Sequence, residues 1–242
     1  MSRDWRIKHG EVIKDFLNYL NQCSGNYILK GGTSLMMCYG LDRFSEDIDL
    51  DGTDKQKIKN IVADFCKDYG YTYRIAKDTD TVKRFMINYD SNTERPKPLK
   101  VEISYRTRNI NRENVTIKNG IAVYNINSIA RMKSSAYTGR DKIRDLFDIS
   151  FICNKYFDEL SETIKDVLRD SLGQKGIEQY DMVVNEQSDE LIDNDLLAES
   201  FLNAWEKLGL SESIDNSPTL SEITENERVK NKKNKTKYEY GN

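Results

Sequence analysis

Histidine, proline and cysteine are scarce in this sequence, whose 242 residues include one histidine, three prolines and four cysteines. The cysteines are Cys23, Cys38, Cys66 and Cys153, and no two of them have Cys-x-x-Cys spacing. Because only His9 could join them as a further ligand, the pattern does not support a zinc site. We expect free thiols, as in a reducing cytoplasm.

Long apolar runs are also missing. No stretch approaches the roughly 18 consecutive apolar residues that a membrane-spanning helix needs. The first five residues, Met-Ser-Arg-Asp-Trp, lack the basic and then apolar pattern of a signal peptide. We therefore expect a cytoplasmic protein that does not act at a membrane.

The chain has little excess charge of either sign. Its 37 Lys and Arg residues nearly balance 40 Asp and Glu residues, for a net charge of −3. The overall charge therefore does not indicate nucleic-acid binding, although a basic surface could be local. With 32% charged and 38% hydrophobic residues, we expect a modest core and a heavily charged surface.

Hydrophobic spacing predicts a mixed first half and a helical second half. The expected helices are 4–21, a short one after Gly31-Gly32 that ends at Gly40, and 53–69; the expected strands are 27–29, 46–50, 71–76, 82–89, 99–105, 115–118 and 121–124. Asn119-Gly120 between the last two strands is a strong hairpin signal. Residues 128–209 contain no proline, and Gly139 and Gly173 are the expected breaks. The fold class is therefore α+β, with a mixed sheet flanked by helices (1–125), a helical unit (126–210) and a tail (211–242) of disordered composition.

Two aspartates on one predicted strand are the first candidate site. Asp47 and Asp49 are two residues apart, so their side chains point to the same face, while Ile48 points to the other. Carboxylates held together repel each other unless a cation neutralises them, and Mg²⁺ prefers such oxygen ligands. The alternative is an exposed strand with a solvated acidic face.

A glycine pair precedes these aspartates. Gly31-Gly32 follows a buried strand and opens a helix, where a phosphate can approach the backbone closely. Thr33 and Ser34 add hydroxyl groups at the same helix start. The segment alone could be an ordinary turn with a helix cap. Followed by Asp-x-Asp on the next strand, it predicts a triphosphate site beside a metal site.

A third carboxylate is expected on a neighbouring strand, as two-metal sites require. Glu102 lies between Val101 and Ile103, where an acid interrupts an otherwise apolar strand. Lys100 shares its face and could contact phosphate or pair with an acid. A solvated edge strand remains the alternative.

These residues resemble a known family. Gly31-Gly32-Thr33 and then Arg43-x-Ser45-x-Asp47-Ile-Asp49 are similar to the signature of the AbiEii/AbiGii-type toxin nucleotidyltransferases of the DNA polymerase β-like superfamily. A later block, Lys133, Arg140 and Arg144-Asp145-Leu-Phe-Asp148, is similar to that family's second set of motifs. The resemblance covers about residues 26–155 and implies a nucleotidyltransferase-type sheet.

The second block also has a meaning of its own. Lys133 lies on the same helical face as Ile129 and Ala136, so its ammonium group either reaches solvent or meets an anion such as triphosphate. Arg144 and Asp148 are four residues apart and could form a helix pair. Asp145 resembles an essential acid of the family, and its role does not follow from the sequence.

The resemblance implies transfer of a nucleoside monophosphate from an NTP to an acceptor hydroxyl. Asp47, Asp49 and Glu102 would hold one or two Mg²⁺ ions, with Lys133 and Asp145 completing the catalytic set. The nucleotide would bind at Gly31, Gly32, Thr33, Ser34, Arg43, Ser45 and Lys133. The implied acceptor is RNA, such as the 3′ end of tRNA, and the implied role is that of a toxin with an antitoxin protein as partner.

Two other functions fit the same residues. The chain could be a nucleotide-binding module without catalysis, or a nucleotidyltransferase with a small-molecule acceptor. In each case we expect the site in a cleft between the sheet and the helical unit. Positive charge should gather there from Lys30, Arg43, Lys100, Lys133, Arg140 and Arg144.

Overall fold

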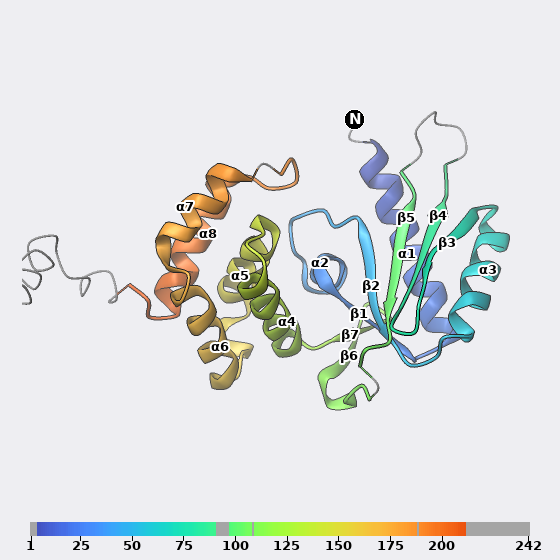
Figure 1. Ribbon diagram of the computed structural model, residues 1–242, viewed down its shortest axis with the longest axis horizontal. Coiled ribbons are helices and arrows are strands. Elements are labelled where there is room, and N and C mark those ends of the chain that lie inside the picture. The colour runs from blue at the N-terminus through green and yellow to red at the C-terminus, as the bar shows by residue number, and fades with distance from the viewer. Residues whose placement is uncertain (1–3, 91–96, 108, 188, 212–242) are drawn as a thin grey trace, which may run out of the picture.

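The computed structural model describes residues 4–90, 97–107, 109–187 and 189–211. One half of the molecule is a sheet with its flanking helices, and the other is a group of helices (Figure 1). The predicted tail lies outside the described residues. None of the described helices is long and apolar enough to cross a bilayer.

The first half consists of a mixed sheet of seven strands in the order β3-β4-β5-β2-β1-β7-β6. The strands are β1 (Tyr27–Lys30), β2 (Asp47–Gly52), β3 (Thr72–Asp78), β4 (Val82–Asn88), β5 (Leu99–Ser104), β6 (Val115–Lys118) and β7 (Ile121–Tyr124). Two neighbouring pairs, β2 with β5 and β1 with β7, are parallel, and the others are antiparallel. The expected α+β class is therefore confirmed.

One face of the sheet is covered by α1 (Asp4–Cys23) and α3 (Lys57–Tyr69). Ile48 of β2 and Phe85 of β4 are fully buried in the core, as are Phe16 and Phe65, whose rings meet edge to face at 5.1 Å. Burial of these side chains holds the strands in the register that the site requires.

The other face of the sheet carries the short helices that follow β1 and the second half of the chain (Figure 1). These short helices are α2 (Gly31–Ser34) and the π-helical η1 (Leu35–Tyr39), which Gly40 ends in the left-handed conformation, as predicted. Two 3₁₀ turns, η2 (Arg112–Asn114) and η3 (Phe157–Glu159), connect longer elements. The predicted hairpin is confirmed, with positive φ at Asn119 and Gly120.

The second half consists of α4 (Ile126–Gly139), α5 (Ile143–Tyr156), α6 (Glu162–Gly173), α7 (Gly176–Glu186) and α8 (Asn194–Lys207). Helices α4 and α6 end at Gly139 and Gly173, the two expected breaks. Two further breaks were not predicted, one at η3 and one between α7 and α8. Asn125 caps α4 by accepting a hydrogen bond from the Ser128 backbone N–H, so the helix begins two residues before the predicted start.

Candidate active site

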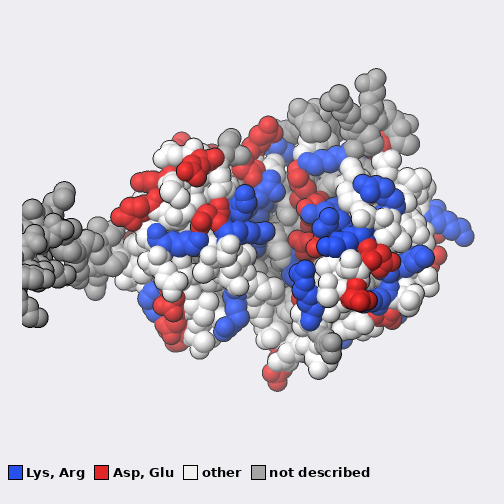
Figure 2. Space-filling model, viewed as in Figure 1, with Lys and Arg blue, Asp and Glu red and all other residues white. Residues whose placement is uncertain are grey.

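Two adjoining cavities lie between the sheet and the helical half. The carboxylate cavity, of about 770 Å³, includes Asp47, Asp49 and Glu102 in its lining. The α4 cavity, of about 860 Å³, is lined on one side by α4. Five residues line both cavities: Gly31, Asp49, Lys133, Arg140 and Asp145. Lys and Arg side chains gather on both sides of the hollow between the two halves (Figure 2), and the six predicted basic residues all line one or both cavities.

The predicted carboxylates come from the parallel strands β2 and β5. Asp49 lies directly beside Glu102 in the strand register, and Asp47 lies beside Lys100. A fourth acid on the same face, Asp51, already has two hydrogen-bond partners. Its carboxylate accepts from Lys30 Nζ at 2.6 Å and from the Tyr124 hydroxyl at 2.9 Å. This pairing separates Asp51 from the three predicted metal ligands.

Basic side chains neutralise two of these three acids. Lys100 forms an ion pair with Asp47, and Arg84 of β4 donates from Nε to Glu102 at 2.7 Å. Arg84 was not predicted as a site residue, although its position opposite Glu102 in the antiparallel β4–β5 pair explains the contact. Within the described part of the chain, no three His, Cys, Asp or Glu residues form a group able to hold a metal ion.

Asp49 differs from its two neighbours in its charge balance. Burial raises the pKa of its carboxyl group, and the negative charges of Asp47 and Glu102 raise it further, against the opposing effect of Lys100 and Lys30. Burial is the largest of these effects, so the raised pKa mainly reflects the cost of holding a charged carboxylate out of water. Carboxylate oxygens are the donors that a hard divalent cation prefers, but Asp47 is paired with Lys100 and Glu102 with Arg84, so a cation would have to displace both basic side chains to bring the three carboxylates together.

The glycine pair brings backbone against these acids. Gly31 has a φ of +77°, and a Cβ added there would lie 3.0 Å from Asp49 Oδ2. A Cβ on Gly32 would lie 2.8 Å from Arg43 Nη2 and 2.9 Å from Ser45 Oγ. A side chain at either position would crowd these groups, so glycine suits both positions, and the predicted approach of a phosphate to this backbone stays a prediction.

The neighbouring hydroxyl groups have partners within the protein. Thr33 donates to the Asp47 carbonyl oxygen, and its Oγ1 lies 2.8 Å from Ser45 Oγ. Ser34 donates to the Gly31 carbonyl oxygen at 2.6 Å. In this arrangement Thr33 and Ser45 connect α2 to the start of β2, Ser34 bonds within α2, and the predicted contact of the three hydroxyl groups with nucleotide stays a prediction.

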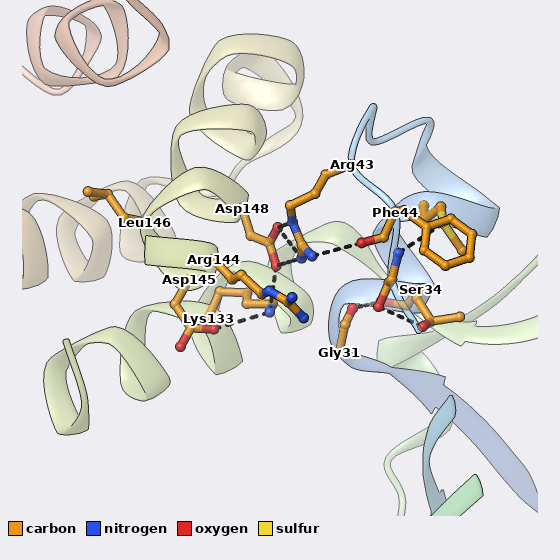
Figure 3. Close-up of polar contacts among 12 residues, drawn as sticks. Gly31, Ser34, Arg43, Phe44, Lys133, Arg144, Asp145, Leu146 and Asp148 are labelled. Atoms are coloured by element: carbon orange, nitrogen blue, oxygen red, sulfur yellow. Dashed lines mark hydrogen bonds and ion pairs between the residues drawn. The ribbon is translucent and has the colours of Figure 1, made fainter. Parts of the chain in front are cut away.

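A buried ionic network connects the two halves of the molecule (Figure 3). Asp148 of α5 accepts hydrogen bonds from Arg43 at 2.8, 3.0 and 3.1 Å, and it pairs with Lys133 Nζ at 2.6 Å. Lys133 also contacts Asp145 at 3.2 Å, and Asp145 accepts from Arg140 Nε at 2.8 Å. The Arg43 and Asp148 side chains are 2% and 0% exposed.

Among the described residues, the network has three cations, Arg43, Lys133 and Arg140, against two paired anions, Asp145 and Asp148, while Asp49 and Asp189 act on Arg140 and Arg43 only through weaker electrostatic effects. The excess positive charge lies at the wall where both cavities meet, which suits an anionic ligand. Asp145 therefore fixes the positions of Lys133 and Arg140, a role that the sequence did not reveal. Lys133 is buried against acids rather than snorkelling to solvent.

Asp148 was not selected as a site residue from the sequence. The sequence did contain a signal for it, since Asp145 and Asp148 interrupt the apolar run of α5. In the structure both side chains are buried. The suggested helix pair between Arg144 and Asp148 is wrong: Arg144 pairs with Asp189 between α7 and α8, because Asp148 already holds two other cations.

Comparison with known proteins agrees with this geometry. Residues 16–223 match the model of the family described as nucleotidyl transferase AbiEii toxin, type IV TA system. The chain belongs to the AbiEii family. Among curated proteins, none matches the sequence.

Solved structures from Helicobacter pylori are similar to this AbiEii chain. JHP933 shares 27% identity, with a TM-score of 0.69, over 89% of this chain and 96% of its own. A putative nucleotidyltransferase from the same species also shares 27% identity and has a TM-score of 0.69, over 90% of this chain and all of its own. MenT4, a nucleotidyltransferase toxin from Mycobacterium tuberculosis, shares 15% identity, with a TM-score of 0.48, over 86% and 88%.

Membership of the AbiEii family makes this chain a toxin nucleotidyltransferase. The family implies an NTP as substrate and an antitoxin as partner. The two cavities between the sheet and the helical half are therefore the candidate active site, since they contain the matching motifs.

Proposed function

We propose that this chain transfers a nucleoside monophosphate from an NTP to a hydroxyl group of RNA, such as the 3′ end of tRNA, with Mg²⁺ as cofactor. Modification of tRNA would halt translation, which accords with a toxin. One observation carries the proposal: Asp47, Asp49 and Glu102 line a cavity into which the cation-rich network around Lys133 also opens.

The three carboxylates would hold one or two Mg²⁺ ions. A bound divalent cation supplies charge neutralisation at the phosphates and lowers the pKa of the acceptor hydroxyl. Lys100 pairs with Asp47 and Arg84 with Glu102, so a cation held by these acids would release two basic side chains that could meet the phosphates.

The phosphates of the NTP would bind to the backbone of Gly31-Gly32 and to Lys133 and Arg140. Lys133 is fixed between Asp145 and Asp148, so its ammonium group needs little reorganisation to meet an anion. Arg140 is more accessible to a ligand, since its side chain is 62% exposed and Asp145 is its ion-pair partner among the described residues.

The reaction forms a bond between the acceptor oxygen and the α-phosphorus and breaks the bond to the leaving pyrophosphate. Asp49 is the first candidate to accept the hydroxyl proton, because it lies where the two cavities meet and burial raises the pKa of its carboxyl group. Glu102, held by Arg84, is the second candidate for this role.

The test is transfer of label from each NTP to total cellular RNA in the presence of Mg²⁺, with wild-type protein and Asp49→Asn. We expect transfer by the wild type and none by the variant, with an unchanged melting temperature or a higher one, because the substitution removes a charge that is repelled. Asp64→Asn is the matched control, since it makes the same change on α3, on the opposite side of the sheet. Full activity of Asp49→Asn would refute the proposed site.

A small-molecule acceptor is the second candidate, since both cavities have volumes typical of small-molecule sites. It predicts transfer to small metabolites or antibiotics and none to RNA. A binding module without catalysis predicts a bound NTP that is not turned over in Mg²⁺.

A further inference from the structure

We infer that the α4 cavity binds the acceptor as an extended phosphodiester strand, with Arg106 and Arg131 as its phosphate ligands. The inference rests on the proposed function, and it assigns the two substrates to two different cavities.

Asp49 lies where the two cavities meet, because it lines both of them together with Gly31 and Lys133. Displacement at the α-phosphorus is in line, so the acceptor hydroxyl and the leaving group lie on opposite sides of the reacting atom. Two substrates that meet at Asp49 from opposite sides must therefore occupy different cavities.

The charges of the two cavities indicate which substrate each one binds. The carboxylate cavity has seven basic and seven acidic side chains in its lining, including Asp47 and Glu102, and it suits an NTP with its cation. The α4 cavity has five basic side chains against the two acids Asp49 and Asp145. This excess of positive charge suits a polyanion that brings no cation of its own.

Two of the basic residues in the α4 cavity are available to a ligand. Arg106 follows β5, Arg131 lies on α4, both are exposed, and neither forms an ion pair with any described residue. The other three, Lys30, Lys133 and Arg140, are held by acids. An arginine on each wall that no described acid engages provides two phosphate contacts from opposite sides.

The wall between these arginines has an apolar part. Ile129, Met132 and Ala136 recur at helical spacing on α4 and line the cavity beside Lys133. Such a wall can contact sugars and base faces, which a strand presents between its phosphates.

The strand also has a path out of the α4 cavity. Arg106 lines a third cavity, of about 690 Å³, together with Thr53, Lys55 and Thr81. A strand whose terminal hydroxyl lies at Asp49 can therefore pass Arg131 and Arg106 and continue toward Lys55. A small-molecule acceptor would not extend into this third cavity.

Binding of a labelled single-stranded RNA of about 12 nucleotides tests this assignment, in the background of Asp49→Asn so that no turnover occurs. We expect Arg106→Ala with Arg131→Ala to weaken binding about tenfold near 0.1 M salt, and to reduce the slope of log affinity against log salt by about 1.4, from two lost phosphate contacts. The control pair, Lys59→Ala with Arg74→Ala, removes the same charge from exposed positions on α3 and β3. Equal losses in the two pairs would overturn the inference.

Steady-state kinetics with the otherwise wild-type protein provide the second measurement. The Arg106 and Arg131 variants should raise the KM for RNA and leave the KM for NTP unchanged. A rise in the KM for NTP without a change in RNA binding would place the nucleotide in the α4 cavity and overturn the inference. A wild type that binds RNA through these arginines and transfers nothing would refute the proposed function instead.

Binding of a single-stranded DNA of the same sequence shows whether the α4 cavity prefers RNA or DNA. RNA binding that equals or exceeds DNA binding agrees with the inference. Preferential binding of DNA, lost in the Arg106 and Arg131 variants, would contradict an RNA acceptor.

Discussion

Asp148 holds two cations from two halves of the molecule without being exposed to solvent. Its carboxylate accepts three hydrogen bonds from Arg43 and pairs with Lys133, whereas Asp145 contacts Lys133 and the more exposed Arg140. Removal of a buried partner leaves uncompensated charge, a larger effect than the pair's own net stabilisation.

We therefore expect Asp148→Ala to lower the free energy of unfolding by about 3–5 kcal/mol, as measured by urea denaturation. The same variant should lower kcat/KM for NTP, because Lys133 loses the shorter of its two ion pairs. Asp166→Ala, which breaks an exposed pair with Arg169, should cost under about 1 kcal/mol. Comparable losses in the two variants would mean that the buried network contributes no more than a surface pair.

His9 is the single histidine of the chain, and it is buried beside the site. Its Nε2 donates to the Glu46 carbonyl oxygen at 2.7 Å, which fixes the tautomer, and Nδ1 accepts from the Tyr89 hydroxyl at 2.6 Å. Burial lowers its pKa from the usual 6.5, with a further contribution from the charge of Lys97, and the hydrogen bond to Glu46 opposes this shift only in part.

A lowered histidine pKa makes stability depend on pH in one direction. The contribution of neutral His9 is present above pH 6.5 and is lost as the pH falls from 6.5 through the pKa of the folded state. Urea denaturation should show this decrease for the wild type and a smaller one for His9→Gln. An identical decrease in both proteins would assign it to the carboxylates.

At the scale of elements, α2 is tightly packed against the segment between η1 and β2. We expect Gly32→Ala to destabilise the protein by about 1–3 kcal/mol and to reduce transfer, because the added Cβ meets Arg43 and Ser45 at less than 3.0 Å. Gly25→Ala is the control, since a Cβ there has no described atom within 4 Å. Thermal unfolding and label transfer measure the two effects, and a Gly32→Ala protein as stable and active as Gly25→Ala would show that the contact relaxes freely.

Most helices and strands could be predicted from the sequence, whereas which of them lie side by side could not. Local signals such as Asn119-Gly120 and the alternation around Asp47 and Asp49 depend on nearby residues, so they can be identified in a single chain. Glu102 was found because an acid interrupts an apolar strand. Its register against Asp49 required the parallel pairing of β2 and β5, which no local signal encodes.

Partners distant in sequence account for what was missed. Arg43 and Asp148 are 105 residues apart, and Arg84 reaches Glu102 only because β4 pairs with β5. The breaks at η3 and between α7 and α8 lack the glycine that marks Gly139 and Gly173, so the helical pattern continues across them. Charge pairing across a fold depends on topology, which no local sequence signal encodes.

For the whole molecule, the site residues all precede the end of α8. The residues that line the carboxylate and α4 cavities extend no further than Asp189, and Leu208 and Leu210 complete the core after them. A chain that ends at residue 211 should therefore keep its melting temperature and its transfer activity at physiological salt. Loss of activity from a stable truncated protein would give residues 212–242 a direct role in the reaction.

The Arg43–Asp148 pair also restricts how this protein can be recombined with its relatives. A chimera that takes residues 1–125 from one homologue and the remainder from another inherits one member of the pair from each parent. Where the parent of the second part has a neutral residue at position 148, the join encloses Arg43 without its carboxylate, and where the parent of the first part has a neutral residue at position 43, Asp148 keeps only Lys133 as its cation. Among hybrids that fold, we expect an excess of combinations that keep both members of the pair or replace both together. The pair therefore indicates which homologues can exchange these two parts, and with them acceptor specificity.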